Sequence, residues 1–434
     1  MNEHRGLSRR GLLQTVATVA GVAATAGFGT VSSLLPQQSE IPDNEKSLPT
    51  FTGPAQNPYW NSVGPVVQYP QKFPLLLLTD RPVQLETPRH YFQTPFTPNG
   101  AFYVRWHLDE IPNSVDLAAW RLSVEGSVGR PLKFSMSDLI SKFKPVTVAA
   151  VNQCSGNSRS KFQPRVPGGQ WGHGAMGNAK WTGVPLRELL DAARLKQEAL
   201  AVQFQGLDKG KGPEGHGSHE FLKSLDLKDS VLDNSIVAYA MNDEPLPMLN
   251  GFPVRLIVPG YFATYWVKSL SWIRVLDKPD ENFWMKTGYR VPDTPRGNTT
   301  PEDVRAGKVT TVPISWMPVR SFIITPDSET KLVAQLPLAI RGIAFSGYGS
   351  VSKLEVSVDD GNSWTSAQLG EDHGPYSFRT WSLAWTPPKP GRYFLSVRAT
   401  DGKGNVQPDG GVWNTGGYLW NRIEREEVVV GRAS

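Results

Sequence analysis

The sequence of 434 residues contains a single cysteine, Cys154. One cysteine excludes an internal disulfide, a cysteine-rich zinc site, an iron–sulfur cluster and a CxxCH haem attachment within this chain. A strong charge of one sign is also lacking: the net charge is +5 and no Lys/Arg-rich run occurs, so nucleic acid is not an expected partner. The GxSxG, HExxH and GxxxxGK[ST] motifs are absent, so serine hydrolase, zinc protease and P-loop chemistry are not indicated.

Glycine, proline and aromatic residues are abundant instead. The 41 Gly and 36 Pro predict many turns and argue against a long helical bundle, while 14 Trp and 18 Phe argue against disorder. A hydrophobic content of 39% is sufficient for a buried core. Because the length is about three times that of a typical domain, we expect more than one domain.

The N-terminus has the features of a targeting signal. Arg9 and Arg10 precede an uncharged, weakly apolar stretch, which predicts a twin-arginine signal peptide over residues 1–40. A single membrane anchor is the alternative, and the glycines and threonines of the stretch disfavour it. Because this route exports folded proteins, often around a cofactor, we expect a periplasmic protein with no stable membrane span after signal removal.

The rest of the chain divides into three segments by composition. Residues 41–98 are rich in Pro, Asn and Gln and predict an extended N-terminal arm with little regular structure. Residues 99–290 predict a loop-rich mixed α+β domain, with an amphipathic helix at Pro185–Ala193. Residues 291–434 show alternating strands without helical periodicity and predict an immunoglobulin-like β-sandwich. The polar segment 289–309 is the expected linker.

The single cysteine lies in a polar loop, Gln153–Arg159, directly after an apolar run at Val146–Val151 that predicts a buried strand. Such a loop presents the thiol, and Arg159 nearby would favour the thiolate. A thiolate without a second cysteine suits a soft-metal ligand or a nucleophile. An inert buried cysteine is the third interpretation, and the residues around Cys154 leave all three open.

A set of segments then carries a family resemblance, because they occur together and in one order. They are Tyr103–His107, Gln153–Arg159 (QCSGNSR), Trp171–Val184, Ala238–Asn242, Asn250–Arg255, Trp266–Lys268, Asn405–Pro408 and Val412–Asn414. The set resembles the sulfite oxidase family of molybdenum enzymes, in particular the bacterial periplasmic sulfite dehydrogenases. The resemblance extends over most of the chain and implies a molybdopterin-binding domain followed by a dimerisation or partner domain.

The resemblance implies a role for individual residues. Cys154 would be the protein's one ligand to molybdenum, beside the two sulfurs of a molybdopterin without a nucleotide. Arg105, Arg159 and Tyr239 would line the substrate site, where guanidinium groups hold a small anion such as sulfite, and Trp171 would form a wall of it. The residues implied in cofactor binding are Arg105, His107, Cys154, Asp208, Asn250, Arg255 and Lys268.

Two positions depart from the animal members of the family. Asn250 stands where they have a histidine, so the position can donate a hydrogen bond but carries no charge. Residues 415–417 read Thr-Gly-Gly where they have an arginine near the substrate. The second departure leaves open which residue supplies that positive charge.

The implied function is oxidation of sulfite to sulfate. Because no second redox motif occurs in the chain, its electrons would pass to an external acceptor, for which a c-type cytochrome is the expected partner. The C-terminal domain would mediate contacts in a homodimer, or in a heterodimer with a cytochrome subunit. Two alternatives stay open: a related molybdoenzyme for another sulfur compound (a sulfane dehydrogenase component or a sulfoxide reductase), and a non-catalytic exported binding module.

Overall fold

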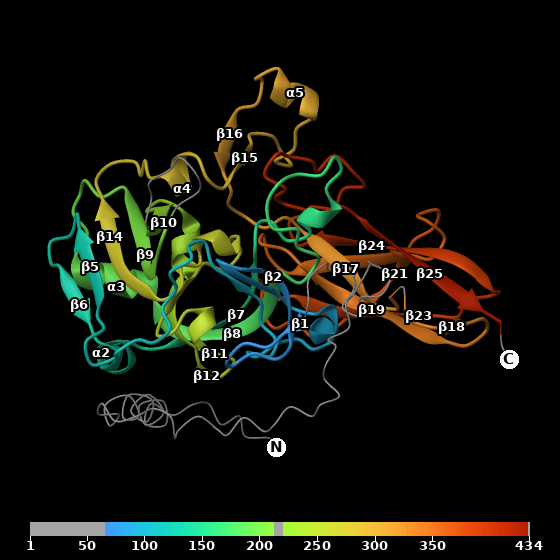
Figure 1. Ribbon diagram of the computed structural model, residues 1–434, viewed down its shortest axis with the longest axis horizontal. Coiled ribbons are helices and arrows are strands. Elements are labelled where there is room, and N and C mark those ends of the chain that lie inside the picture. The colour runs from blue at the N-terminus through green and yellow to red at the C-terminus, as the bar shows by residue number, and fades with distance from the viewer. Residues whose placement is uncertain (1–65, 212–219, 328, 433–434) are drawn as a thin grey trace.

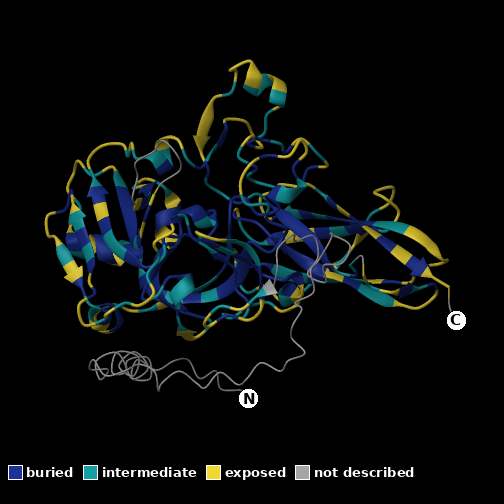
Figure 2. Cartoon of the chain, in the orientation of Figure 1, coloured by how far each residue is buried: buried dark blue, intermediate teal, exposed yellow. Residues whose placement is uncertain are grey.

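The computed structural model describes residues 66–211, 220–327 and 329–432, and the predicted signal peptide lies outside these ranges. Figure 1 shows two lobes side by side, the first blue to yellow and the second orange to red. Both consist mostly of strands, and the helices are short. Figure 2 shows that the buried residues concentrate on the strands, whereas the connecting loops are more exposed. No helix in the described ranges is both long and apolar enough to span a bilayer.

The first lobe opens with a four-stranded sheet in a segment that is expected to be an irregular arm. Its strands, in sheet order, are β1 (Val66–Val67), β2 (Leu75–Asp80), β3 (Val83–Glu86) and β4 (Val104–Arg105), and the 3-10 helix η4 (Arg89–Gln93) lies between the last two. The sheet forms because Leu75, Leu85 and Trp106 bury one another in a small core of their own. The expectation of little regular structure is therefore wrong for residues 66–98.

Two larger sheets form the centre of the first lobe. One has the order β10 (Glu220–Asp226), β9 (Ala201–Lys209), β14 (Leu270–Leu276), β5 (Leu122–Gly126) and β6 (Leu132–Phe134). The other has the order β12 (Glu244–Pro245), β11 (Ile236–Met241), β8 (Met176–Pro185) and β7 (Val146–Gln153), with β13 (Arg255–Ile257) also paired to β11. Helices α2 (Met136–Lys142) and α3 (Leu186–Ala193) pack on these strands, which confirms the predicted helix.

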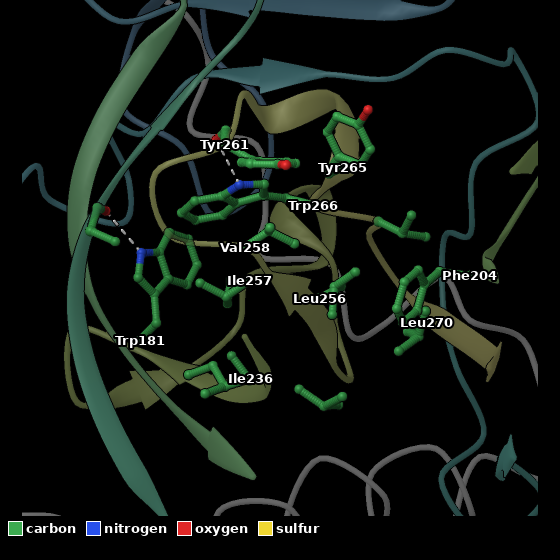
Figure 3. Close-up of a cluster of buried hydrophobic side chains, with 14 of the residues drawn as sticks. Trp181, Phe204, Ile236, Leu256, Ile257, Val258, Tyr261, Tyr265, Trp266 and Leu270 are labelled. Carbon is green, nitrogen blue, oxygen red and sulfur yellow. Dashed lines mark hydrogen bonds between the residues drawn. The ribbon is translucent and has the colours of Figure 1, made fainter. Parts of the chain in front are cut away.

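Aromatic side chains stiffen the core beneath β13. Figure 3 shows Trp181 and Trp266 among the aliphatic side chains of this core. Their rings meet edge to face with centroids 5.7 Å apart. Each buried indole N–H is satisfied, since Trp181 donates to the carbonyl of Ala150 and Trp266 to that of Tyr261. The two indoles thus form a rigid platform beside the first residue of β13, Arg255.

The second lobe consists of two sheets that share one core. One has the order β17 (Arg320–Thr325), β19 (Leu338–Phe345), β23 (Arg379–Trp385) and β22 (Gln368–Leu369). The other has the order β18 (Leu332–Val333), β25 (Glu424–Gly431), β24 (Gly391–Asp401), β20 (Val351–Ser357) and β21 (Thr365–Ser366). Both contribute to the core, for example Ile340 and Trp381 from the first and Leu354 and Val397 from the second. This is the predicted two-sheet arrangement, and its immunoglobulin type stays a prediction.

The segment expected to be a linker contains some regular secondary structure. β15 (Arg290–Pro292) pairs with β16 (Thr311–Pro313), and α5 (Pro301–Arg305) lies between them, at the top of Figure 1. The lobes also pack directly, since Phe322 of β17 contacts Phe92 of η4 with ring centroids 6.0 Å apart. The remaining short helices are η5 (Arg159–Lys161), η6 (Ser230–Asn234), η7 (Met248–Asn250), η8 (Ala263–Tyr265) and α4 (Phe283–Lys286).

Candidate active site

One cavity of the first lobe gathers most of the predicted site residues. Six of them line it, and they come from β4, the loop after β7, η7, β13 and the segment before β14: Arg105, His107, Cys154, Asn250, Arg255 and Lys268. The other lining residues are Tyr103, Asn152, Ser155, Leu249, Ala263, Thr264 and Tyr289. Segments far apart in the sequence therefore meet at one hollow with a thiol in its wall.

Strand β7 positions the thiol. It pairs along its length with β8, and Cys154 follows its last residue, with the backbone N–H donating to the carbonyl of Ala175 at 2.9 Å. The loop turns back at once, because Asn157 donates to the Cys154 carbonyl and Ser158 takes a left-handed conformation, with φ of 66°. Cys154 is buried at 8% exposure, yet it faces the cavity. It is accessible to a bound ligand and shielded from bulk solvent.

The cavity is rich in positive charge. The pKa of Arg255 is lowered to about 10 by burial, and the pKa of Lys268 is lowered by burial and by the charge of Arg255 beside it. Among the described residues, Asp208 is the carboxyl whose charge acts on Lys268, and burial raises the pKa of Asp208 itself. Cations that repel one another in a buried site favour an anionic ligand.

Several polar atoms at the cavity wall have no partner in the described part of the chain. They are Asn152 Nδ2, Ser155 Oγ, Arg255 Nε and Thr264 Oγ1. Buried donors without acceptors are costly, so a ligand with several acceptor atoms fits this wall. A soft sulfur ligand, surplus cations and unmatched donors together suit an anionic, heteroatom-rich metal cofactor.

His107 lines the cavity, and aromatic side chains pack against its ring. Its ring stacks on Phe221 with centroids 3.5 Å apart, and the edges of Trp284 and Tyr289 approach it at 5.5 and 5.3 Å. Burial and the charges of Arg105, Lys268 and Lys223 hold the pKa of His107 well below its ordinary value. The ring is therefore neutral at physiological pH, and it can offer one donor and one acceptor to a ligand.

Two tyrosines line the cavity, Tyr103 and Tyr289, whereas Tyr239 does not; the Tyr103 hydroxyl already donates to Asn152 Oδ1 at 2.6 Å. Tyr239 lies in β11, where every residue is buried, and it belongs to the apolar core of the lobe. Tyr289 lines the cavity, and burial raises its pKa well above the ordinary value, so its hydroxyl stays protonated. Tyr239 therefore does not line this cavity, and its role in the substrate site stays a prediction. Tyr289 has a left-handed φ of 54° and lies directly before β15. The sequence around it gives no sign that its side chain reaches the cavity.

Arg159, Trp171 and Asp208 are buried near the cavity without lining it. The guanidinium of Arg159 donates to the carbonyls of Gly416 (3.1 Å) and Gly169 (3.1 Å). Trp171 meets the ring of Tyr103 edge to face, with centroids 6.4 Å apart, so it stands behind a lining residue. Asp208 acts at a distance, through its charge on Lys268.

The second lobe closes one side of the site with an aromatic side chain. Tyr418 stacks on Tyr289 with ring centroids 5.7 Å apart, and the guanidinium of Arg159 lies 5.2 Å from the centre of the Tyr418 ring. The N–H of Leu419 donates to the carbonyl of Ser155, the residue after the cysteine. Tyr418 thus covers this side of the site, and Arg159 and Arg105 are the cations whose charges act on it.

Comparison with known proteins identifies the family. Residues 107–284 match the model of the oxidoreductase molybdopterin binding domain, and residues 311–430 match that of the Mo-co oxidoreductase dimerisation domain. Mitochondrial sulfite oxidase of Rattus norvegicus is 33% identical over 393 residues, which cover 87% of this chain and 68% of the relative. The human enzyme is 32% identical over 420 residues, covering 92% and 71%.

The chain belongs to the sulfite oxidase family. This membership makes it a molybdenum oxidoreductase with a molybdopterin cofactor, which sets aside the non-catalytic binding module. The cavity fits that cofactor through its thiol, its cations and its unmatched donors.

Among solved structures, the sulfane dehydrogenase SoxCD from Paracoccus pantotrophus matches with a TM-score of 0.69 and 26% identity, covering 82% of this chain and 88% of that one. Nitrate reductase [NADH] 2 of Arabidopsis thaliana is 32% identical over 353 residues, which cover 76% of this chain and 38% of the relative.

Proposed function

We propose that the protein is a sulfite dehydrogenase, which oxidises sulfite to sulfate and passes two electrons to an external acceptor. The observation that carries the proposal is the buried thiol of Cys154 in a cavity lined by Arg105, Arg255 and Lys268. When bound, molybdenum with its molybdopterin would supply a two-electron redox centre for the overall conversion of sulfite and water to sulfate, two protons and two electrons. Sulfite and sulfate are small anions, and a cavity with surplus positive charge suits both of them.

The proposed role of each residue depends on where it lies in the site. Cys154 is the metal ligand, and Arg255, Lys268, His107 and Asn250 hold the cofactor. Arg105 and Arg159 attract the substrate, Asp208 balances the charge of Lys268, and Trp171 shields the site from water behind Tyr103. Tyr289 replaces Tyr239 as the hydroxyl group of the site, because its protonated side chain can donate to a bound oxyanion.

Features of the sequence and the family support a proposal for the cellular location, the electron acceptor and the oligomeric state of the enzyme. The pair Arg9-Arg10 supports export of the folded holoenzyme to the periplasm. The acceptor is a c-type cytochrome, because the chain has no second redox motif of its own. The family model of a dimerisation domain at residues 311–430 supports a homodimer formed by the second lobe.

The first experiment measures molybdenum content and sulfite-dependent reduction of ferricyanide on the same purified sample. We expect about one molybdenum per chain, since the described residues offer one soft ligand at the cavity, together with sulfite turnover. The C154S variant should lose turnover by several orders of magnitude, because a serine hydroxyl does not replace a thiolate as a soft ligand. Molybdenum without sulfite turnover in the wild type would remove sulfite as the substrate.

The match to the sulfane dehydrogenase SoxCD favours one second candidate, the oxidation of carrier-bound sulfane sulfur. The two substrates differ in size and in access, since sulfite is a free small anion and sulfane sulfur arrives on a carrier. Steady-state rates with sulfite, with a persulfidated thiol and with a sulfoxide separate these activities. A value of kcat/KM for the persulfide above that for sulfite would favour the second candidate.

A further inference from the structure

A buried lysine of the N-terminal sheet reaches the cavity wall from behind. Lys72 lies in the turn between β1 and β2 and is 3% exposed. Its ammonium donates to the carbonyl oxygens of Asn99 (2.8 Å) and Phe102 (2.9 Å), and to Oδ1 of Asn250. None of these acceptors is charged, and no carboxylate in the described ranges pairs with Lys72. A lysine in this setting serves something other than a salt bridge.

Asn250 is the last residue of the short helix η7, and the turn that carries Lys72 contacts this helix at a second point. The backbone N–H of Lys72 donates to the carbonyl of Tyr69, which closes the turn. The side-chain oxygen of Gln71 accepts from the backbone N–H of Met248, the first residue of η7. The turn therefore holds both ends of η7, Met248 at one end and Asn250 at the other.

These contacts fix the orientation of the Asn250 amide. An ammonium has no acceptor, so Oδ1 must face Lys72. Nδ2 then faces Tyr103, to whose carbonyl it donates at 3.1 Å. No described residue accepts the second N–H of Nδ2, and Asn250 lines the cavity. Lys72 thus orients the amide of Asn250 so that one N–H of Nδ2 can donate to a ligand in the cavity.

Lys72 also adds to the positive charge around this part of the cavity. Burial, followed by the charge of Arg255, lowers the pKa of Lys72 to about 7. Arg255 is itself anchored to this place, because its Nη1 donates to the carbonyl of Asn250 at 2.9 Å. Lys268 lines the same cavity, so three buried cations lie at its wall or directly behind it. A phosphate monoester, with up to two negative charges and several acceptor oxygens, matches this group in charge and in hydrogen bonding.

We propose that Lys72 positions the side-chain amide of Asn250 as a donor to the phosphate-bearing end of the pterin. The proposal rests on the proposed function only in that the chain holds this cofactor; it is independent of the substrate. Lys72 acts through Asn250, because all three of its N–H groups are taken by protein oxygens. It is therefore a positioning residue.

The test measures pterin release from purified holoenzyme, through the fluorescence of the released and oxidised pterin over time. K72M keeps most of the side-chain length and removes the charge, so release should become about tenfold faster, as expected for a lost charge-assisted hydrogen bond. K72R keeps a cation and a donor for Asn250, and it should release the pterin within about threefold of the wild-type rate. K196M, at an exposed lysine, is the matched control and should not change release.

A double-mutant cycle separates this role from general packing. If Lys72 acts through Asn250, K72M should add less than about twofold to the release rate of N250A, because the group that Lys72 positions is already gone. The proposal is overturned if K72M releases pterin at the wild-type rate, if K72M and K72R accelerate release equally, or if the effects of K72M and N250A multiply. A wild type that retains pterin without oxidising sulfite would refute the substrate and leave this proposal intact.

Discussion

At the scale of single residues, two buried tyrosines differ in what they face. Tyr289 lines the cavity that Cys154 also lines, whereas Tyr239 belongs to the apolar core. Burial keeps the Tyr289 hydroxyl protonated, so it can donate to an oxyanion. We expect Y289F to lower kcat/KM for sulfite by about 10²-fold, the usual cost of one lost donor at a developing charge.

Y239F is the matched control for that change. It removes the same atom from another buried tyrosine of the same lobe, and it should leave kcat/KM within about threefold of the wild type. Molybdenum content is measured in both variants, so that loss of cofactor is not taken for loss of rate. A stronger effect of Y239F than of Y289F would restore the assignment made from sequence.

At the scale of elements, the loop after β7 packs its glycines around one guanidinium. A Cβ built on Gly156 would lie 2.4 Å from Arg159 Nη2, and a Cβ on Gly168 would lie 2.9 Å from Nη1. The backbone of Gly156 is not left-handed, so alanine there acts through this clash and not through strain. G156A should displace the guanidinium and raise KM for sulfite about tenfold, because the charge of Arg159 would attract the anion less from beside the cavity, with molybdenum content unchanged.

G410A is the control for this substitution, since a Cβ on Gly410 meets no atom within 4 Å. It should leave KM and kcat unchanged. If G156A also left KM unchanged, the Arg159 guanidinium would have no part in holding the substrate. If G156A lost its molybdenum, the loop would serve the cofactor and not the anion.

Elements with a local signal could be predicted, and those that depend on distant contacts could not. β7 and α3 show their apolar patterns within a few residues, and the loop of Cys154 follows β7 directly. The strands of residues 66–98 were not predicted, because their burial depends on Trp106, which lies beyond the segment. Tyr289 was missed because it precedes a polar, Pro-rich segment, and only the folded chain brings it to Cys154. Lys72 reads as an ordinary surface charge until its contacts with Asn250 are known.

At the scale of the whole molecule, a buried polar network joins the two lobes behind the cysteine loop. Arg320 of β17 donates to Gln153 Oε1 (3.1 Å) and Ser158 Oγ (2.5 Å), and it pairs with Glu424 of β25 (3.3 Å). His173 of the first lobe lies 2.7 Å from Glu424 through Nε2. The second lobe thus holds the residue before Cys154, so its packing and the geometry of the cofactor site depend on each other.

The network also fixes the protonation of its members. Nδ1 of His173 lies 3.0 Å from Nη2 of Arg320 and 2.7 Å from Oγ of Ser158, and as the acceptor for these donors it belongs to a neutral ring. Burial lowers the pKa of His173 to about 3, against the opposing effect of Glu424. For Glu424 burial acts to raise the pKa, but the hydrogen bond from His173 and the charge of Arg320 lower it and hold the carboxyl ionised.

Protonation in the unfolded state makes this arrangement sensitive to acid. Above pH of about 6.5 the histidine is neutral in both states and contributes nothing to pH dependence. Between about 6.5 and 3 only the unfolded chain binds the proton, so His173 lowers the free energy of unfolding by about 1.4 kcal/mol for each pH unit. Glu86 and Glu426, whose pKa values burial raises to about 7, bind protons in the folded state and oppose this trend. The contribution of His173 must therefore be measured as a difference between variants.

H173Q isolates that contribution, because a glutamine can still donate to Glu424 but does not titrate. The free energy of unfolding, measured by denaturant titration from pH 7 to 4.5, should fall more steeply for the wild type than for H173Q, and the two curves should diverge below pH of about 6.5. Parallel curves for the wild type and H173Q would mean that His173 is charged in the folded protein. The network would then join the lobes through an ion pair of His173 and Glu424, and acid would loosen the lobes only where Glu424 itself takes up a proton.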